Sequence, residues 1–204
     1  MSKARLFVIG GCNGSGKSSY AKAVTPIGVE SFDYDKEFLK VYNAMYDSEL
    51  RAEIAHNKTR QLLKDSVTNS IKLQRDFCYE TNFNSTPMHW PEMFRAAGFE
   101  LNLFFFCLDS VEKAKERVRI RVENGGHFVP DNEIEERYKL GFENLDRLFA
   151  QFDFVHLFDS SFYKEEPHHI LSAREGQLIY FSEFPEFLKL LIPTIAKMAS
   201  ENWH

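Results

Sequence analysis

The sequence lacks an excess of basic residues. Its 25 Lys and Arg residues are outnumbered by 30 Asp and Glu residues, which gives a formal net charge of −5. A protein that binds nucleic acid in general needs a clustered basic surface to neutralise phosphates. We therefore expect no nucleic-acid partner.

Long hydrophobic runs and paired cysteines are missing as well. The apolar run after Lys3 and Arg5 covers only residues 6–9, which is too short for the core of a signal peptide. No other segment approaches the roughly 20 apolar residues of a membrane-spanning helix. The three cysteines are odd in number and far apart, which suits reduced thiols better than a disulfide framework. These absences predict a cytoplasmic protein with no membrane partner.

Strand-like and helix-like segments alternate along the chain. Buried strands are expected at residues 5–10, 29–32, 77–79, 99–108 and 154–161. The alternation predicts an α/β fold of the P-loop kinase type, with a mostly parallel five-stranded sheet flanked by helices. We expect residues 1–204 to form one domain, with a lid at about 117–137. A C-terminal appendage at about 162–204 should hold a hairpin around Glu175-Gly176 and a last helix.

A glycine-rich loop follows the first predicted strand and precedes a predicted helix. Residues 11–18, GCNGSGKS, match the P-loop pattern G-x-x-x-x-G-K-[ST]. Glycines let backbone N–H groups converge on an anion, and the helix adds the positive end of its dipole. Lys17 should reach the β- and γ-phosphates of ATP, and the Ser18 hydroxyl should hold Mg²⁺. The expected nucleotide-binding residues are Asn13, Gly14, Ser15, Gly16, Lys17, Ser18 and Ser19.

The signatures of other P-loop classes are absent from the sequence. The only Asn-Lys pair, Asn57-Lys58, lacks the aspartate of a guanine reader, and no Asp-x-x-Gly switch occurs. Asp109 follows the strand at 99–108, where a motor-type ATPase places a magnesium ligand. Its spacing to Glu112 is also that of a capping box, and we favour a helix-capping role for Asp109.

Two carboxylates follow the second predicted strand, at Asp33 and Asp35. In an extended segment residues i and i+2 point the same way, so both carboxylates are expected to face the phosphates. One would accept the proton of an acceptor hydroxyl while the other orients magnesium-bound water. The alternative is a solvated acidic turn.

Three basic residues repeat at helical spacing: Lys113, Arg117 and Arg121. Stacked like charges cost a helix a few tenths of a kcal/mol per pair, which is more easily tolerated if an anion faces them. Gly125-Gly126 follows as a hinge, and the next helix carries Arg137. This pattern predicts a lid that closes arginines over phosphates; the alternative is a solvated basic face.

Taken in order, these motifs resemble the zeta-toxin-like kinases. The resemblance runs from the P-loop through FDYDKE and FCYETN to ERVRIRVENGGHFVPDNEIEERY, over residues 6–161. It implies an ATP-dependent phosphotransferase, and the characterised toxins of the family phosphorylate UDP-N-acetylglucosamine. It also implies that Asp35 is the catalytic base, that Glu80 contacts the substrate or the magnesium site, and that Arg117 and Arg121 are lid arginines. The expected catalytic residues are thus Asp35, Lys17, Arg117 and Arg121, the substrate contacts Asp33, Glu80, Thr81 and Arg137, and the metal ligands Ser18 and Asp33.

The sequence departs from the nucleotide-sugar toxins at two places. Those toxins tend to show Asp-x-Phe-Arg and Glu-Gly-Thr-Phe-Arg, whereas this chain has DKEF from Asp35 and ETNFN from Glu80. Both arginines are missing, so a nucleotide-sugar acceptor does not follow from the resemblance. A metabolic kinase of the shikimate-kinase type and a non-catalytic nucleotide-binding module stay open as alternatives. An antitoxin partner is not visible in the sequence.

Overall fold

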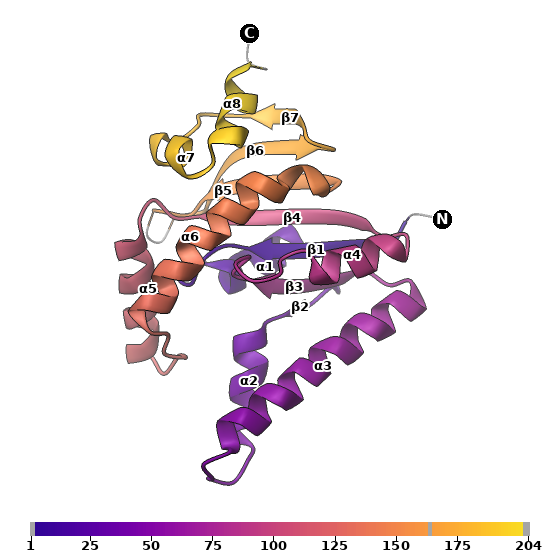
Figure 1. Ribbon diagram of the computed structural model, residues 1–204, viewed down its shortest axis with the longest axis vertical. Coiled ribbons are helices and arrows are strands. Elements are labelled where there is room, and N and C mark those ends of the chain that lie inside the picture. Colours follow the sequence, from indigo (N-terminus) through magenta and orange to yellow (C-terminus); the bar gives the residue numbers. More distant parts are fainter. Residues whose placement is uncertain (1–2, 163–164, 202–204) are drawn as a thin grey trace.

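The computed structural model describes residues 3–162 and 165–201 of the 204-residue chain and contains a seven-stranded sheet with flanking helices (Figure 1). The strand order is β2-β3-β1-β4-β5-β6-β7. The pairings from β2 to β5 are parallel, and those of β6 and β7 are antiparallel. The strands are β1 Arg5–Gly10, β2 Ser31–Phe32, β3 Phe77–Thr81, β4 Glu100–Cys107, β5 Phe154–Asp159, β6 His168–Arg174 and β7 Gln177–Phe181.

The predicted α/β class with a mostly parallel sheet is confirmed, but the predicted count of five strands is wrong. The C-terminal hairpin pairs with β5 from Phe154↔Arg174 to Asp159↔His168 and so adds two strands to the sheet. A two-stranded hairpin is marginally stable alone, and an open edge at β5 would leave unpaired backbone groups. Residues 163–164 and 202–204 of the expected appendage lie outside the described residues.

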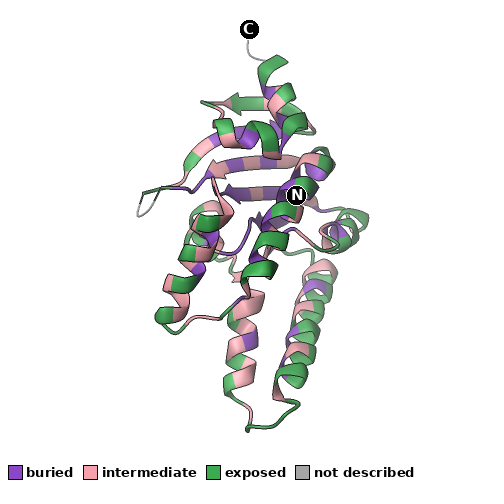
Figure 2. Cartoon of the chain, turned by 60° about the vertical axis from the view of Figure 1, so that its left-hand side comes forward, coloured by how far each residue is buried: buried purple, intermediate pink, exposed green. Residues whose placement is uncertain are grey.

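The helices lie on both sides of the sheet and beyond one of its edges. They are α1 Lys17–Val24, α2 Tyr34–Asn43, α3 Arg51–Leu73, α4 His89–Ala96, α5 Val111–Glu123, α6 Asp131–Leu148, α7 Glu186–Leu191 and α8 Pro193–Glu201. Helices α2 and α3 project together from the β2 side of the sheet, away from the C-terminal hairpin (Figure 1). Figure 2 shows that buried residues concentrate in the strands, whereas the α2–α3 pair is largely exposed or half-buried. Among the described residues, no helix combines the length and the apolar character needed to cross a membrane.

The two faces of the sheet pack against separate cores, because alternate side chains of a strand point to opposite faces. Leu103 and Phe105 of β4 belong to the larger core, where Phe105 contacts Phe142 of α6 at a ring-centroid distance of 5.6 Å. Phe106 belongs to the smaller core with Ile9. Packing on both faces holds β1, β3 and β4 in place, so that their carboxyl ends form a stable base for loops.

The start of α5 differs from the prediction that Asp109 caps this helix. Ser110 is the capping residue, and its Oγ accepts a hydrogen bond from the Lys113 backbone N–H at 3.4 Å. Asp109 instead forms an ion pair with the Lys113 side chain at 2.5 Å. Serine and aspartate are both good capping residues, so neighbouring residues of these types compete for the same position.

Candidate functional site

A cavity of about 350 Å³ lies over the glycine loop, at the carboxyl ends of β1, β2 and β3; we call it the first cavity. Most of the predicted site residues meet there. Its lining consists of Asn13, Gly14, Gly16, Lys17, Ser18, Ser19, Asp33, Tyr34, Asp35, Glu80, Thr81, Asn82, Arg117 and Arg121. Among the predicted residues, Ser15 and Arg137 are not part of this lining.

The glycine loop has a backbone that side chains would prevent. Gly14 and Gly16 adopt φ angles of 78° and 86°, in the left-handed region that glycine tolerates best. A Cβ atom on Gly14 would lie 2.9 Å from the Ala114 carbonyl oxygen. Helix α1 begins directly after this turn, at Lys17. The N–H groups of Ser19 and Tyr20 donate to the Gly16 carbonyl oxygen, and the N–H groups ahead of them form an anion-binding end.

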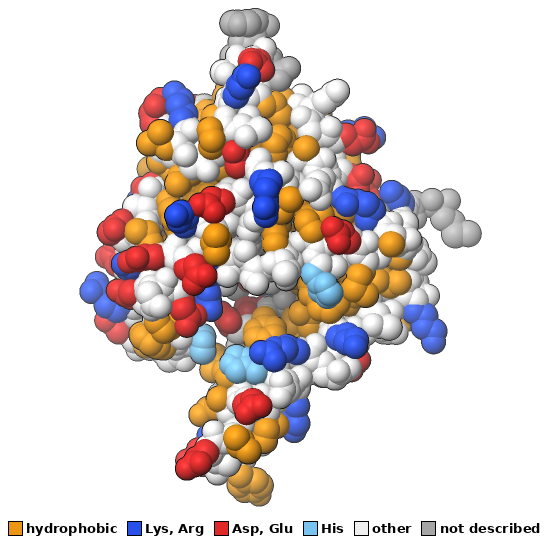
Figure 3. Space-filling model, viewed as in Figure 1, with side chains coloured by type: hydrophobic (Ala, Val, Ile, Leu, Met, Phe, Trp, Pro, Cys, Tyr) orange, Lys and Arg blue, Asp and Glu red, His pale blue; other side chains and the backbone are white. Residues whose placement is uncertain are grey.

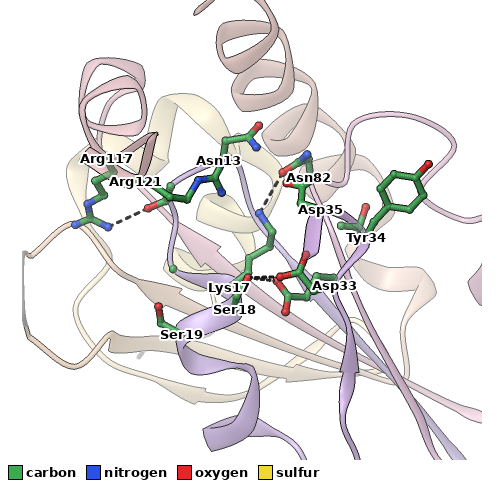
Figure 4. Close-up of a pocket in the computed structure, with 14 residues that line it drawn as sticks. Asn13, Lys17, Ser18, Ser19, Asp33, Tyr34, Asp35, Asn82, Arg117 and Arg121 are labelled. Carbon is green, nitrogen blue, oxygen red and sulfur yellow. Dashed lines mark hydrogen bonds between the residues drawn. The ribbon is translucent and has the colours of Figure 1, made fainter. Parts of the chain in front are cut away.

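Lys17 folds back onto the loop in this structure. Its Nζ donates to the carbonyl oxygens of Gly11 at 2.7 Å and Cys12 at 2.9 Å, and to Asn82 Oδ1 at 3.1 Å (Figure 4). Burial lowers the pKa of Lys17, and nearby acidic groups oppose this effect. Since every partner is an oxygen atom, phosphate oxygens would suit the same donors. The Ser15 Oγ, buried in the loop, has no hydrogen-bond partner among the described residues, as expected of a loop shaped for a ligand.

Oxygen atoms from three elements converge at Ser18. Its hydroxyl lies 3.0 Å from Asp33 Oδ2 and 2.6 Å from Glu80 Oε2. Burial raises the pKa of Glu80, and the charge of Asp33 adds to that rise. A hydroxyl and one or two carboxylates, completed by phosphate oxygens and water, are the ligands that Mg²⁺ prefers. Within the described residues, no group of three or more His, Cys, Asp or Glu side chains is placed to hold a metal. A cation here would therefore need ligands besides these carboxylates, such as the Ser18 hydroxyl and phosphate oxygens of the nucleotide.

We predicted an extended segment at residues 33–35, and this prediction is wrong. Asp33 caps α2, because its Oδ1 accepts a hydrogen bond from the Lys36 N–H at 3.1 Å, and the helix begins at Tyr34. Asp35 thus lies in the first turn of α2. Both carboxylates still line the first cavity, but Asp33 is fixed beside Ser18 while Asp35 is not hydrogen-bonded to it. Asp33 capped the helix because aspartate satisfies free N–H groups at a helix start.

The two predicted lid arginines have different surroundings. Arg117 donates to the carbonyl oxygens of Gly14 at 3.3 Å, Ser160 at 2.8 Å and Ser161 at 3.1 Å. It therefore ties the glycine loop to the segment after β5. Arg121 donates to the His127 carbonyl oxygen at 3.0 Å, and its buried Nε has no partner among the described residues. Arg121 has the donor capacity that a phosphate could use, whereas the Arg117 donors are already engaged.

A second cavity, of about 360 Å³, adjoins the first. Tyr34, Asp35, Glu80, Thr81 and Asn82 line both cavities. The carboxylate of Asp35 therefore stands at the border between the phosphate side and a separate space. In Figure 3 a hollow in the surface contains acidic side chains, and histidine side chains lie around its rim.

Two predicted substrate contacts have defined partners in this region. Arg137 lines the second cavity, pairs with Glu133 at 2.6 Å and donates to Asn13 Oδ1 at 3.2 Å. Thr81 Oγ1 accepts a hydrogen bond from the Phe83 N–H at 3.0 Å, which turns the chain after β3. Their contact with a substrate stays a prediction.

Asn82 is a site residue that the sequence reasoning missed. It lines both cavities and bonds Lys17. The loop around it is held tightly: Asn144 Nδ2 donates to the Phe83 carbonyl oxygen at 2.9 Å, and a Cβ on Gly141 would lie 2.9 Å from the Asn82 carbonyl oxygen. We predicted β3 to end at residue 79, but it runs to Thr81. The residue at the strand end is therefore Asn82, and a correct strand length would have identified it.

Two comparisons with known proteins concern the sequence. The sequence profile of one family, described as "Zeta toxin", matches residues 2–164. A search of curated proteins found no match.

Several solved structures share the fold. One comes from the PezAT chromosomal toxin–antitoxin system of Streptococcus pneumoniae, with a TM-score of 0.62, 14% identity, and coverage of 98% of this chain and 88% of the other. A second is the complex of AvrRxo1-ORF1 and AvrRxo1-ORF2 with ATP, with a TM-score of 0.65, 13% identity, and coverage of 99% and 65%. A third belongs to the Pnkp1/Rnl/Hen1 RNA repair complex, with a TM-score of 0.53, 22% identity, and coverage of 75% and 47%. At these identities the similarity establishes the fold alone.

Proposed function

Because the chain belongs to the zeta toxin family, we propose that it transfers the γ-phosphate of ATP to a hydroxyl group of a small molecule. The observation that carries the proposal is the place of Asp35, which lines both the first and the second cavity. A carboxylate between a phosphate site and an acceptor site can receive the proton that an attacking hydroxyl loses.

The first cavity would position ATP. Lys17 would exchange the carbonyl oxygens of Gly11 and Cys12 for phosphate oxygens, which suit the same ammonium donors. The N–H groups at the start of α1 would add further donors. A magnesium ion held at Ser18 and Asp33 would neutralise part of the phosphate charge. That an ATP complex is known for AvrRxo1-ORF1:AvrRxo1-ORF2, a structure with a similar fold, supports nucleotide binding by this chain.

The transfer itself would begin in the second cavity. The acceptor oxygen forms a bond to the γ-phosphorus, the bond to the β–γ bridging oxygen breaks, and ADP leaves with that electron pair. The proton of the acceptor hydroxyl passes to Asp35. Arg121 would stabilise the negative charge that gathers on the transferring group, because its Nε is without a partner in the described chain.

Incubation with ATP and a metabolite extract tests the proposal. The protein should yield ADP and at least one phosphorylated metabolite that is absent from a reaction without protein. ATP binding without any such product would contradict phosphotransfer and favour a nucleotide-binding module.

A further inference from the structure

The charge balance of the second cavity bears on the chemistry of the acceptor. Among the described residues that line it, Arg137 is the only permanent cation, whereas Asp35 and Glu80 are both acids. The Arg137 guanidinium is engaged by Glu133 at 2.6 Å and by Asn13 at 3.2 Å. Two of the Arg137 N–H groups are therefore committed within the protein, and the described lining offers a phosphorylated ligand no second ammonium or guanidinium group. An additional anion would lie close to two carboxylates, which is unfavourable in a partly buried site.

One histidine of the second cavity adds no positive charge to it near pH 7. His56, His89 and His127 line it. Burial lowers the pKa of His56, and the positive charge of Arg60 and the neighbouring His127 lower it further. His56 is therefore a neutral hydrogen-bonding group near pH 7.

One arginine lies near the rim of the cavity without lining it. Arg60 is exposed on α3 and donates to Asn57 Oδ1 at 3.2 Å. An exposed guanidinium is surrounded by water and counterions, so it attracts a ligand anion only weakly. The nucleotide-sugar toxins tend to have an arginine in each of the motifs that begin here at Asp35 and Glu80, and this chain has neither. Arg60 is a poor substitute for them as a binder of phosphate.

The rest of the lining suits hydroxyl groups. The loop after β3 contributes the amides of Asn82 and Asn84 and the hydroxyls of Ser85 and Thr86, and α4 adds the half-buried ring of Trp90. Amides and hydroxyls both donate and accept hydrogen bonds, as a compound with several hydroxyl groups requires. A flat aromatic ring can pack against the apolar face of a sugar or a base.

From this lining we propose that the acceptor is an uncharged compound with several hydroxyl groups, of the size of a monosaccharide or a nucleoside, and not a phosphorylated or nucleotide-linked one. The inference rests on the proposed phosphotransfer and narrows its substrate class. The step is the one described above: the acceptor hydroxyl oxygen bonds to the γ-phosphorus, its proton goes to Asp35, and ADP is released.

Fractionation of a metabolite extract by charge tests the acceptor class directly. The extract is passed over anion and cation exchangers in series, which leaves uncharged compounds in the flow-through. The unfractionated extract, the flow-through and the material eluted from each exchanger are then incubated with the protein and γ-labelled ATP. We expect labelled product from the unfractionated extract and from the flow-through only.

The outcomes separate the two proposals. No label from the unfractionated extract would contradict phosphotransfer itself, and the acceptor inference would fall with it. Label from the unfractionated extract and from an exchanger eluate, alone or together with the flow-through, would overturn the uncharged acceptor while leaving phosphotransfer intact.

Two variants provide a matched test with the same flow-through as the probe. Trp90→Leu should raise the concentration needed for half-maximal product formation about tenfold, because burial of a large apolar surface is worth about 1.5–3 kcal/mol. Arg60→Gln should change that concentration by less than about twofold. The inference is wrong if Arg60→Gln raises the concentration needed for half-maximal product formation about tenfold and added salt raises that concentration equally for the unmodified protein. Both results would indicate an anionic acceptor.

Discussion

The two adjoining cavities are built in different ways. The first is made of the glycine loop with the start of α1, of residues at the ends of neighbouring parallel strands, and of two arginines from α5. The second is bordered by segments that are distant in sequence: the α2–α3 pair, the loop after β3, and the start of α6 with the loop before it. The glycine loop, which is expected to bind the phosphates, is thus encoded locally, whereas recognition of the acceptor depends on how distant segments pack.

The difference extends to the contacts that hold each cavity. The glycine loop is fixed from outside by Arg117 and by Ser160, whose Oγ donates to the Ser15 carbonyl oxygen at 2.8 Å. Beside the second cavity, the α2–α3 pair meets the loop before α6 through contacts between aromatic rings. Phe38 stacks on His56 at a centroid distance of 4.1 Å and meets the edge of His127 at 5.8 Å. Ring contacts of this kind allow more adjustment than hydrogen bonds to the backbone, so we expect closure of the lid to occur on this side.

The largest expected effect concerns the residue that both cavities share. Asp35→Asn preserves the shape of the side chain but removes its ability to accept a proton. General-base catalysis contributes about a hundredfold to ten-thousandfold, so turnover should fall by that factor while ATP still binds. Initial rates of product formation and calorimetric titration with ATP measure the two quantities.

Glu37→Gln is the control for Asp35, because Glu37 lies in the same first turn of α2 and lines neither cavity. It should retain full turnover. Asp33→Asn should instead raise the magnesium concentration required for turnover. Loss of turnover in Asp33→Asn at saturating magnesium, with Asp35→Asn active, would assign the base to Asp33.

The next effect lies in the first cavity alone. Lys17→Ala removes the side chain that is expected to contact the β- and γ-phosphates. ATP affinity and turnover should both decline, turnover by about a hundredfold to a thousandfold, as for other charge-stabilising donors. Lys22→Ala, an exposed residue on the same helix, should leave both unchanged. Unaltered ATP affinity in Lys17→Ala would remove the basis for a phosphate site at this loop.

Arg117 and Arg121 of α5 both line the first cavity but have different hydrogen-bond partners, so their variants should have different effects. Arg121→Ala should lower turnover about tenfold to a hundredfold with a smaller change in ATP affinity, since it meets charge mainly in the reacting state. Arg117→Ala should lower turnover and, unlike Arg121→Ala, also the melting temperature. Three backbone carbonyls lose a charged donor in this variant, and such hydrogen bonds contribute about 1.5–3 kcal/mol.

Arg119→Ala controls for the loss of a basic residue on α5, since its side chain is exposed and lines neither cavity. Thermal unfolding and steady-state kinetics on the three variants separate the roles. Equal melting temperatures for Arg117→Ala and Arg119→Ala would mean that Arg117 does not fix the glycine loop.

The smallest effect is on stability and depends on pH. Burial raises the pKa of Glu80 in the folded protein. Its contribution to stability is therefore complete below the ordinary glutamate pKa of about 4.3 and is lost as pH rises through the folded value. Glu80→Gln removes this loss, so without ligands the variant should melt higher than the unmodified protein at neutral pH and equally at low pH. A lower melting temperature at neutral pH would show that the Glu80 carboxylate stabilises the fold.

Sequence patterns predicted the first cavity better than the second. The glycine loop and the strand before it follow local rules, and the predicted P-loop residues lie together apart from the buried Ser15. The wrong predictions arise where neighbouring residues compete to cap a helix or where tertiary packing determines the position of a segment. Ser110 and not Asp109 caps α5, Asp33 starts α2 earlier than expected, and the hairpin joins the sheet at β5. Asn82 was missed because β3 extends to Thr81, two residues beyond its predicted end, and because α6 holds the following loop from 60 residues away in sequence through Asn144 and Asn84.

The central claim is that the γ-phosphate of ATP in the first cavity is transferred to an acceptor in the second cavity, with Asp35 as the base. The fate of labelled ATP tests this claim most directly. The protein is incubated with a metabolite extract and with ATP labelled in either the γ- or the α-phosphate, and the small-molecule products are separated from nucleotides. The account predicts product label from γ-labelled ATP alone, reduced by at least about a hundredfold in Asp35→Asn. Product label from α-labelled ATP, or equal γ-label in Asp35→Asn and the unmodified protein, would contradict it.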